Sequence, residues 1–217
     1  MTVVYEDNHI IIVDKTCSEI VQGDKTGDTP LSEVVKQYIK EKYAKPGEVF
    51  LGVTHRLDRP VSGLVMFART SKALSRLNKM FQDGEIHKTY WALVKNEPPK
   101  AEDDLVHWLV RNEKQNKSYA YDKEVPNSKK ALLHYKVIGR TESYFLVEVD
   151  LKTGRHHQIR CQLAKIGCPI KGDLKYGAKR SNPDGGISLQ AHAMNFIHPV
   201  SKKEISVETC KKLTVIS

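Results

Sequence analysis

The stretch His55–Ala68 (HRLDRPVSGLVMFA) is the part of this chain that decides its fold. Its first half places one aspartate, Asp58, between two arginines, and Pro60 and Gly63 interrupt any helical pattern. Its second half is a short apolar run of the kind that forms a buried strand. The stretch therefore predicts a loop that feeds a core strand and places a carboxylate at the mouth of that strand.

The charges of this loop also have a simpler interpretation. Arg56, Asp58 and Arg59 could form a solvated surface cluster, since surface ion pairs are common and contribute only about 0–1 kcal/mol. A functional interpretation of Asp58 therefore needs support from the rest of the chain.

Strands and helices are predicted on both sides of the loop. Apolar β-branched runs predict the strands, and apolar residues at three-and-four spacing predict the helices. The predicted strands are 8–13, 49–53, 64–68, 86–94, 105–110, 118–121, 132–138, 144–151, 189–196 and 204–209, the predicted helices are 31–43, 71–83 and 156–166, and residues 96–104 and 174–188 are predicted connections.

The order of these elements indicates the fold class. Strand follows strand through much of the chain, which favours antiparallel pairing, and few strand–helix–strand alternations occur. We therefore expect an α+β fold with a mixed, largely antiparallel sheet. A chain of 217 residues can bury one sizeable core, so a single domain is expected over residues 1–217.

Composition excludes several classes of protein. No apolar run approaches the ~20 residues of a membrane-spanning helix, and the first residues lack the basic and apolar segments of a signal peptide. We therefore expect a cytoplasmic protein with no membrane partner. The four cysteines form no Cys-x-x-Cys pair, and His157 and Cys161, four residues apart, have no second ligand pair, so no metal site is predicted.

The net charge of +9 indicates a polyanionic partner. The stretch 152–180 holds eight Lys or Arg and a single acid, Asp173. A solvated helix face normally mixes both signs, so this one-sided distribution favours binding to the phosphates of a nucleic acid.

Common catalytic signatures do not explain the chain. It has no P-loop, no Gly-x-Gly-x-x-Gly, no His-Glu-x-x-His and no Gly-x-Ser-x-Gly. A Ser-His-Asp triad stays open as an alternative, because such triads are defined by geometry. What stands out is an aspartate in an arginine-rich loop, a tyrosine on a predicted strand and an arginine on a predicted helix.

Four motifs occur in order along the chain, and together they resemble those of the RluA-type pseudouridine synthases over nearly its whole length. The motifs are HRLD with SGL at 55–64, KTYWALV at 88–94, GRHHQIR at 154–160 continuing through IGCPIKGD to 173 and YG at 176–177, and LQAH with FIHP at 189–199.

The resemblance implies a pseudouridine synthase fold, with helices flanking the sheet and a central RNA-binding cleft. It implies that the chain converts specific uridines in rRNA or tRNA to pseudouridine, as a monomer without a cofactor. Asp58 corresponds to the catalytic aspartate, Tyr90 to the active-site tyrosine and Arg160 to the arginine that pairs with the aspartate. Arg56 corresponds to the arginine that fills the gap left by the flipped base. Further substrate-binding residues by the same resemblance are His55, Leu57, Lys88, Arg155, His157, Gln158 and Ile159.

Physical chemistry agrees with these roles. Breaking the N-glycosidic bond and rejoining the base through C5 needs a group that stabilises or traps the separated sugar or base, and a carboxylate can do this. Burial disfavours an ionised aspartate, but an arginine in contact restores it. A uridine must also leave its stack to react, and an aromatic ring such as Tyr90 can hold the flipped base. Addition to C1′ and an elimination route both stay open.

Two departures from the family pattern concern the substrate. The family's Asn-Lys-Pro-x-Gly motif keeps only Lys15 here, and Gln162 stands where a histidine is common. No S4 RNA-binding domain is expected before the catalytic segment. The alternative functions are a catalytically idle RNA-binding or ribosome-assembly protein, which intact Asp58, Tyr90 and Arg160 argue against, and a glycosidase. A glycosidase would need a second carboxylate, for which the matched motifs offer only Asp173.

Overall fold

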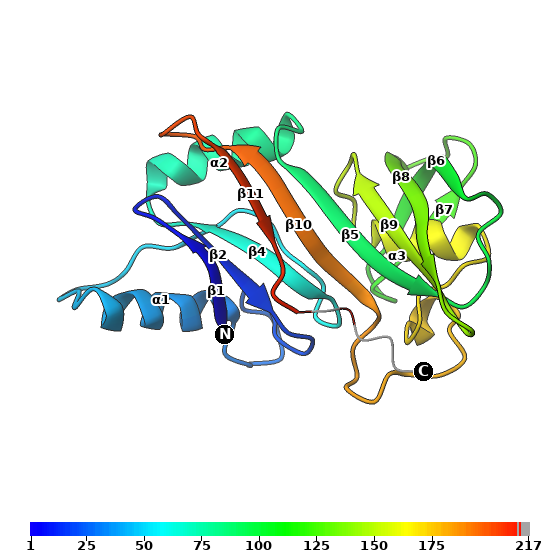
Figure 1. The fold of residues 1–217 in the computed structure, drawn as a ribbon, viewed down its shortest axis with the longest axis horizontal. Coiled ribbons are helices and arrows are strands. Elements are labelled where there is room, and N and C mark those ends of the chain that lie inside the picture. The colour runs from blue at the N-terminus through cyan, green and yellow to red at the C-terminus, as the bar shows by residue number, and fades with distance from the viewer. Residues whose placement is uncertain (212, 214–217) are drawn as a thin grey trace. The chain divides into compact units, whose positions relative to one another are not determined.

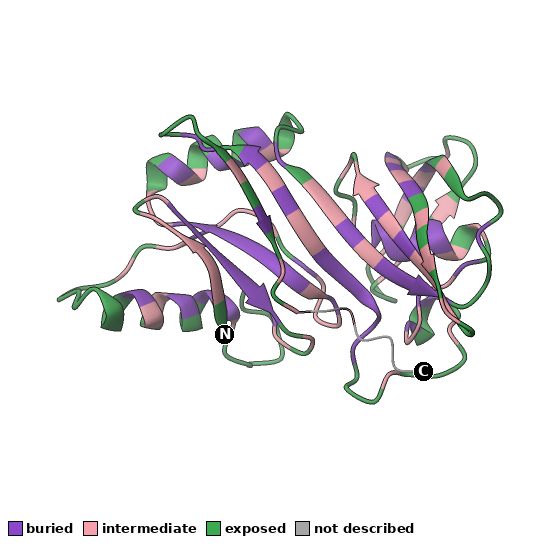
Figure 2. Cartoon of the chain, in the orientation of Figure 1, coloured by how far each residue is buried: buried purple, intermediate pink, exposed green. Residues whose placement is uncertain are grey.

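The central strands of the structure are β2 (Ile10–Lys15) and β4 (Ser62–Ala68), which are buried along almost their whole length (Figure 2). Runs of Ile, Val, Leu, Met and Phe fill both strands, as expected where both faces of a sheet are covered. The two strands pair antiparallel, from Ile10 opposite Ala68 to Lys15 opposite Gly63. The strand predicted to leave the His55 loop is therefore confirmed.

The computed structural model describes residues 1–211 and 213, and its contacts divide into two compact units (Figure 1). Of the described residues, the first unit contains 1–86 and 191–211, and the second contains 87–190 and 213. The chain passes to the second unit between Ile86 and His87 and returns within β10 (Leu189–Ile197). The expected single domain over 1–217 stays a prediction.

The first unit builds its sheet around β2 and β4. The strand order is β1-β2-β4-β10, with β3 on β4 and β11 on β10. Its further elements are the strands β1 (Thr2–Glu6), β3 (Gly52–Val53) and β11 (Glu204–Glu208) and the helices α1 (Leu31–Lys42) and α2 (Ser71–Gln82).

Helix α2 packs on one face of this sheet. The hydroxyl of Thr70 caps its first turn by accepting a hydrogen bond from the Ala73 amide at 3.1 Å, which confirms the predicted cap. Leu77 and Met80 of the helix lie in one core cluster with residues of β2, β4 and β10. The apolar face of this amphipathic helix thus packs into the core of the first unit.

Helix α1 is joined to the end of β1 by polar contacts. Tyr38 and Lys42 of the helix donate hydrogen bonds to the Glu6 carboxylate at 2.9 and 2.7 Å. Arg69 lies 3.3 Å from the same carboxylate. Burial acts to raise the pKa of Glu6, but hydrogen bonds from Lys42, Tyr43 and Tyr38 lower it overall. Glu6 therefore connects three segments of the first unit.

The second unit is an antiparallel sheet with one helix packed on it. Its strand order is β5-β9-β8-β6-β7. Leu109, Ala131 and Cys161 share a core cluster under the helix. The elements are β5 (His87–Val94), β6 (Glu102–Asn112), β7 (Lys117–Tyr121), β8 (Lys129–Arg140), β9 (Phe145–Leu151), α3 (Gln158–Lys165) and the 3₁₀ turn η1 (Leu174–Tyr176).

Gln162 explains how α3 is bonded to the strands beneath it. This glutamine is fully buried, and its Nε2 lies 2.9 Å from Nδ1 of His107 and 3.3 Å from the Leu105 carbonyl. An amide donates two hydrogens where an imidazole donates one, so Gln162 can bond to both partners. The residue that departs from the family pattern thus has a structural role inside the second unit.

Candidate active site

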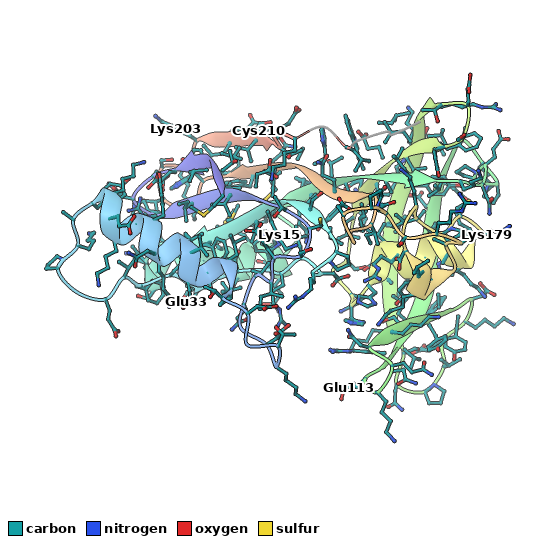
Figure 3. The ribbon with its side chains drawn as sticks, turned by 90° about the horizontal axis from the view of Figure 1, so that it is seen from below. Lys15, Glu33, Glu113, Lys179, Lys203 and Cys210 are labelled. Carbon is teal, nitrogen blue, oxygen red and sulfur yellow. The ribbon has the colours of Figure 1, made fainter. Side chains whose placement is uncertain are left out.

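The loop of residues 54–61 runs between β3 and β4, and its main chain is held by Lys15 (labelled in Figure 3). Lys15 ends β2 and is fully buried. Its Nζ donates to the carbonyl oxygens of Val61 at 2.6 Å, Arg59 at 3.0 Å and Asp58 at 3.3 Å. The Val61 amide also donates to the Asp58 carbonyl at 3.0 Å, which closes a turn. The residue with the candidate carboxylate is therefore held through its backbone.

Burial carries an electrostatic cost for this lysine. Loss of water lowers the pKa of the Lys15 ammonium from 10.5 to about 8, although the Glu19 carboxylate acts in the opposite direction. At neutral pH the side chain keeps its proton, and its three hydrogens are shared among the loop carbonyls and that of Thr16, at 3.0 Å. The sequence alone marks Lys15 only as the remnant of a motif. The signal for its role is a lysine at the end of a strand that begins with four apolar residues.

Gly63 fixes the point where the loop joins the sheet. Its φ of +111° is one that side-chain-bearing residues rarely adopt. A Cβ at this position would lie 2.3 Å from the carbonyl oxygen of Ala191 in β10. Glycine is therefore required where β4 passes β10, five residues after Asp58.

The charged side chains of the loop have different environments. Arg59 pairs with Asp28 at 2.8 Å and with Asp24 at 3.7 Å. It also donates to the hydroxyl of Thr26 at 2.9 Å. The surface-cluster interpretation therefore holds for Arg59, whose partners lie in residues 24–28. Arg56 is exposed, as a residue that contacts RNA must be.

His55 and Leu57 are packed within the first unit. Nε2 of His55 accepts a hydrogen bond from the Met66 amide at 3.0 Å, and its ring lies 4.9 Å from that of Phe81. Leu57 is buried. These contacts hold the loop against β4 and α2, and direct contact of either residue with RNA stays a prediction.

Strand β5 carries two of the predicted residues, Lys88 and Tyr90, on one face, since alternate residues of a strand share a face. Tyr90 is buried and lies opposite Val149 of β9. Burial lowers the pKa of Lys88 to about 8. The structure thus brings these two residues together on one strand of the second unit.

Arg160 lies on α3 and forms a two-point ion pair that the sequence analysis did not predict. Its Nε donates to Oδ2 of Asp173 at 2.7 Å, and its Nη2 donates to Oδ1 at 2.8 Å. The guanidinium carbon lies 5.1 Å from the centre of the Tyr176 ring. Arg160 and Asp173 are both buried. No sequence spacing identifies Asp173 as the partner, because the connection 166–172 brings it back to the helix.

The residues before Arg160 hold the start of α3. His157 has a left-handed φ of 52°, and its Nδ1 lies 2.9 Å from the hydroxyl of Tyr176. That hydroxyl accepts a hydrogen bond from the Ser118 amide at 2.8 Å, so its own hydrogen is directed to His157. Burial and the nearby Arg160 charge lower the pKa of His157 to about 2. The imidazole is therefore neutral.

Gln158, Ile159 and Arg155 complete the predicted substrate-binding set. Oε1 of Gln158 accepts from the Arg155 amide at 3.0 Å, and its Nε2 donates to the Leu132 carbonyl at 3.0 Å. Ile159 is buried, whereas Arg155 is exposed and its Nε donates to the Lys130 carbonyl at 2.9 Å. Contact of these residues and of His157 with RNA stays a prediction, and Arg155 is the one with an exposed cation.

The basic stretch 152–180 is only partly neutralised within the structure. Lys152 pairs with Asp150, Lys165 with Asp122 at 3.3 Å, and Arg160 with Asp173. The remaining cations have no carboxylate within ion-pair distance in the described part of the chain, and these are Arg155, Lys171, Lys175, Lys179 and Arg180. A cationic surface therefore survives on the second unit, with Lys179 labelled in Figure 3.

The three principal predicted residues belong to different units. Asp58 is in the first unit, and Tyr90 and Arg160 are in the second. The meeting of Arg160 with Asp58 that the resemblance implies therefore stays a prediction.

The fold is that of a pseudouridine synthase. The structure matches human RNA pseudouridylate synthase domain containing 4 with a TM-score of 0.79, at 22% identity, over 97% of this chain and 88% of the other. The RNA pseudouridylate synthase family model matches residues 9–165, and the chain belongs to that family.

Curated relatives agree with this membership. An uncharacterized RNA pseudouridine synthase of Aquifex aeolicus is 33% identical over 92% of this chain and 66% of its own length. Ribosomal large subunit pseudouridine synthase C of Buchnera aphidicola is 30% identical over 94% of this chain and 65% of its own. The chain thus spans about two thirds of the length of these relatives.

The described residues offer neither a side-chain cluster for a metal ion nor a helix that could span a membrane. No group of three or more His, Cys, Asp or Glu side chains among them is placed to hold a metal ion. Cys161 Sγ, which stands four residues after His157, instead lies 3.2 Å from the Ser118 carbonyl. None of the helices in the part of the chain that the structure describes is long and apolar enough to cross a membrane.

Proposed function

We propose that this chain is an RNA pseudouridine synthase that isomerises specific uridines in rRNA or tRNA. The observation that carries the proposal is the loop of residues 54–61, which holds Asp58 through its backbone on buried Lys15, in a chain of the RNA pseudouridylate synthase family. A relative named as a large ribosomal subunit synthase favours rRNA as the first substrate to test.

The reaction suits a site made of side chains alone. The N1–C1′ bond of the uridine breaks, the base rotates, and a C5–C1′ bond forms. The hydrogen at C5 leaves as a proton and N1 gains one, so nothing is oxidised or reduced. Asp58 stabilises or traps the separated fragments, either by adding to C1′ or by an elimination route.

The other residues have distinct roles in the proposal. Arg160 pairs with Asp58 and keeps its carboxylate ionised as RNA excludes water. Tyr90 receives the flipped uracil, and Arg56 occupies the gap it leaves. Arg155, Lys171, Lys175, Lys179 and Arg180 bind phosphates. We further propose that the protein acts as a monomer in the cytoplasm without a metal or other cofactor.

The test is release of tritium from RNA transcribed with uridine labelled at C5. Purified protein is mixed with large-subunit rRNA or with unmodified tRNA, and the modified position is mapped by mass spectrometry. Asp58→Asn should abolish release and leave RNA binding within a few fold, because the amide keeps the size of the side chain and loses the anion. Asp83→Asn, which removes a surface partner of Lys79 in the same unit, is the matched control and should react like the unmodified chain.

Two outcomes would overturn the proposal. Tight RNA binding with no tritium release from either RNA would make the chain an idle binding protein. Release by Asp58→Asn near the rate of the unmodified chain would remove Asp58 from the chemistry.

A further inference from the structure

We infer that Asp173 is a positioning residue for the reaction, because it holds the guanidinium of Arg160 in a single orientation. The inference rests on the proposed function, in which Arg160 pairs with Asp58. It adds a carboxylate that lies outside the predicted site residues and that the sequence offered only as a possible second glycosidase acid.

The geometry of the ion pair fixes the orientation of the Arg160 guanidinium. Two parallel hydrogen bonds, at 2.7 and 2.8 Å, join one edge of the guanidinium to both oxygens of Asp173. Arg160 is 5% exposed and Asp173 is 1% exposed, so water does not compete for either group. Two-point pairing of this kind restricts rotation about the arginine side chain as well as its position.

The backbone of Asp173 is itself held by hydrogen bonds. Its amide donates to the Ile170 carbonyl at 3.0 Å, and its carbonyl accepts from the amides of Tyr176 and Ala178 at 3.1 and 3.0 Å. Gly172, just before it, has φ +87°, and a Cβ there would lie 2.7 Å from the Asn182 side chain. The turn that presents the carboxylate therefore has little freedom to move.

Tyr176 adds a contact at the face of the guanidinium. The guanidinium carbon lies 5.1 Å from the ring centre, within the range of a cation–π interaction. The hydroxyl of Tyr176 is held by the Ser118 amide at 2.8 Å and lies 2.9 Å from Nδ1 of His157. Arg160 is thus contacted at one edge by Asp173 and at one face by Tyr176.

This arrangement determines what Arg160 can do for a substrate. A guanidinium carries five N–H donors in one plane, and Asp173 engages two of them, on Nε and Nη2. The donors on the opposite edge, which include those of Nη1, then point in a direction that Asp173 sets. In the proposed reaction that edge pairs with Asp58. Loss of Asp173 leaves the charge of Arg160 in place but no longer fixes the orientation of its guanidinium. The rate of turnover therefore falls more than the affinity for substrate does.

The test is a double-mutant cycle on single-turnover rates in the tritium-release assay, with saturating RNA. Asp173→Asn should lower the rate constant at least tenfold, because an amide offers one acceptor and turns its NH₂ toward the other guanidinium donor. The half-saturating RNA concentration should stay within threefold. In an Arg160→Met background the same Asp173→Asn change should alter the rate less than twofold, since Asp173 then has nothing to position.

A purely structural role for Asp173 predicts a different result. It would lower thermal stability and reduce the rate by the same factor in both backgrounds, and that outcome overturns the inference. An unchanged rate in Asp173→Asn also overturns it. Asp122→Asn is the matched control, because it removes the partner of Lys165 on the same helix and should leave the rate unchanged.

A second variant keeps the test valid if Asp173→Asn does not fold. Arg160→Lys keeps the charge beside Asp173 and loses the two-point geometry, so it should also lose at least tenfold in rate. Wild-type rates in Arg160→Lys would overturn the inference. Failure of the proposed function is distinguishable, because the unmodified chain would then release no tritium and Asp58→Asn would have no activity to lose.

Discussion

Lys15 makes a testable contribution to the pH dependence of stability. The perturbation is Lys15→Met, which keeps much of the length of the side chain and removes its titrating group. Burial lowers the pKa of Lys15 from 10.5 to about 8 in the folded state. At about 1.4 kcal/mol per pH unit, the folded environment disfavours the charged form by about 3 kcal/mol.

The sign follows from proton binding. Between pH 8 and 10.5 the unfolded chain keeps the Lys15 proton and the folded chain releases it, so the unfolded state binds more protons. Stability therefore rises with pH in that window. The free energy of unfolding of the unmodified chain, minus that of Lys15→Met, should be flat from pH 6 to 7.5 and should then grow by about 3 kcal/mol by pH 10.5.

Urea unfolding at closely spaced pH values measures this difference. Other groups with shifted pKa values, such as Lys88 and the thiols of Cys161 and Cys168, titrate in both proteins, so their contributions cancel in the subtraction. Lys36→Met, at a half-exposed position paired with Glu33, is the matched control for loss of a lysine outside the core. A flat difference for Lys15→Met would show that Lys15 does not bear the cost of desolvation.

Two further predictions concern the glycine at the strand junction and the cationic surface. Gly63→Ala should lower the free energy of unfolding by at least about 3 kcal/mol, because it combines a strained φ with a clash against the Ala191 backbone. Gly47→Ala, whose Cβ meets nothing within 4 Å, is the control and should melt close to the temperature of the unmodified chain. RNA affinity should fall steeply with salt, by a slope of ~0.7 per phosphate contact on single strands, and Lys179→Glu with Arg180→Glu should reduce that slope in a filter-binding titration. An unchanged slope would place the RNA surface elsewhere.

Local signals predicted most of the secondary structure. Helix α2 begins after the capping hydroxyl of Thr70, and α1 begins after Pro30, because such end signals are read from neighbouring residues. Strand β1 was missed, since five residues with a mixed pattern look like an irregular terminus until β2 is available to pair with them. Strand β6 begins at Glu102, inside a predicted connection, and Glu102 pairs opposite Lys136 of β8.

The sequence motifs predicted which residues form the candidate site, but not which residues hold them in place. The sequence places Asp58 on a loop, Tyr90 on a strand and Arg160 on a helix, and the structure agrees with all three placements. The sequence does not indicate that Lys15 holds the loop or that Asp173 holds Arg160. Those contacts depend on the approach of segments that are distant in sequence, which no periodicity encodes.

The division of the chain has a consequence for synthesis on the ribosome. Almost all of the described second unit is the single segment 87–190, whereas the first unit needs residues 191–211 to complete it. At about 5–20 residues per second, β10 emerges roughly 6–24 s after β4. During that interval the edge of β4 that will pair with β10 is an open template for other strands. Nascent chains of this protein therefore have a defined period in which a holding chaperone has an apolar strand edge to protect.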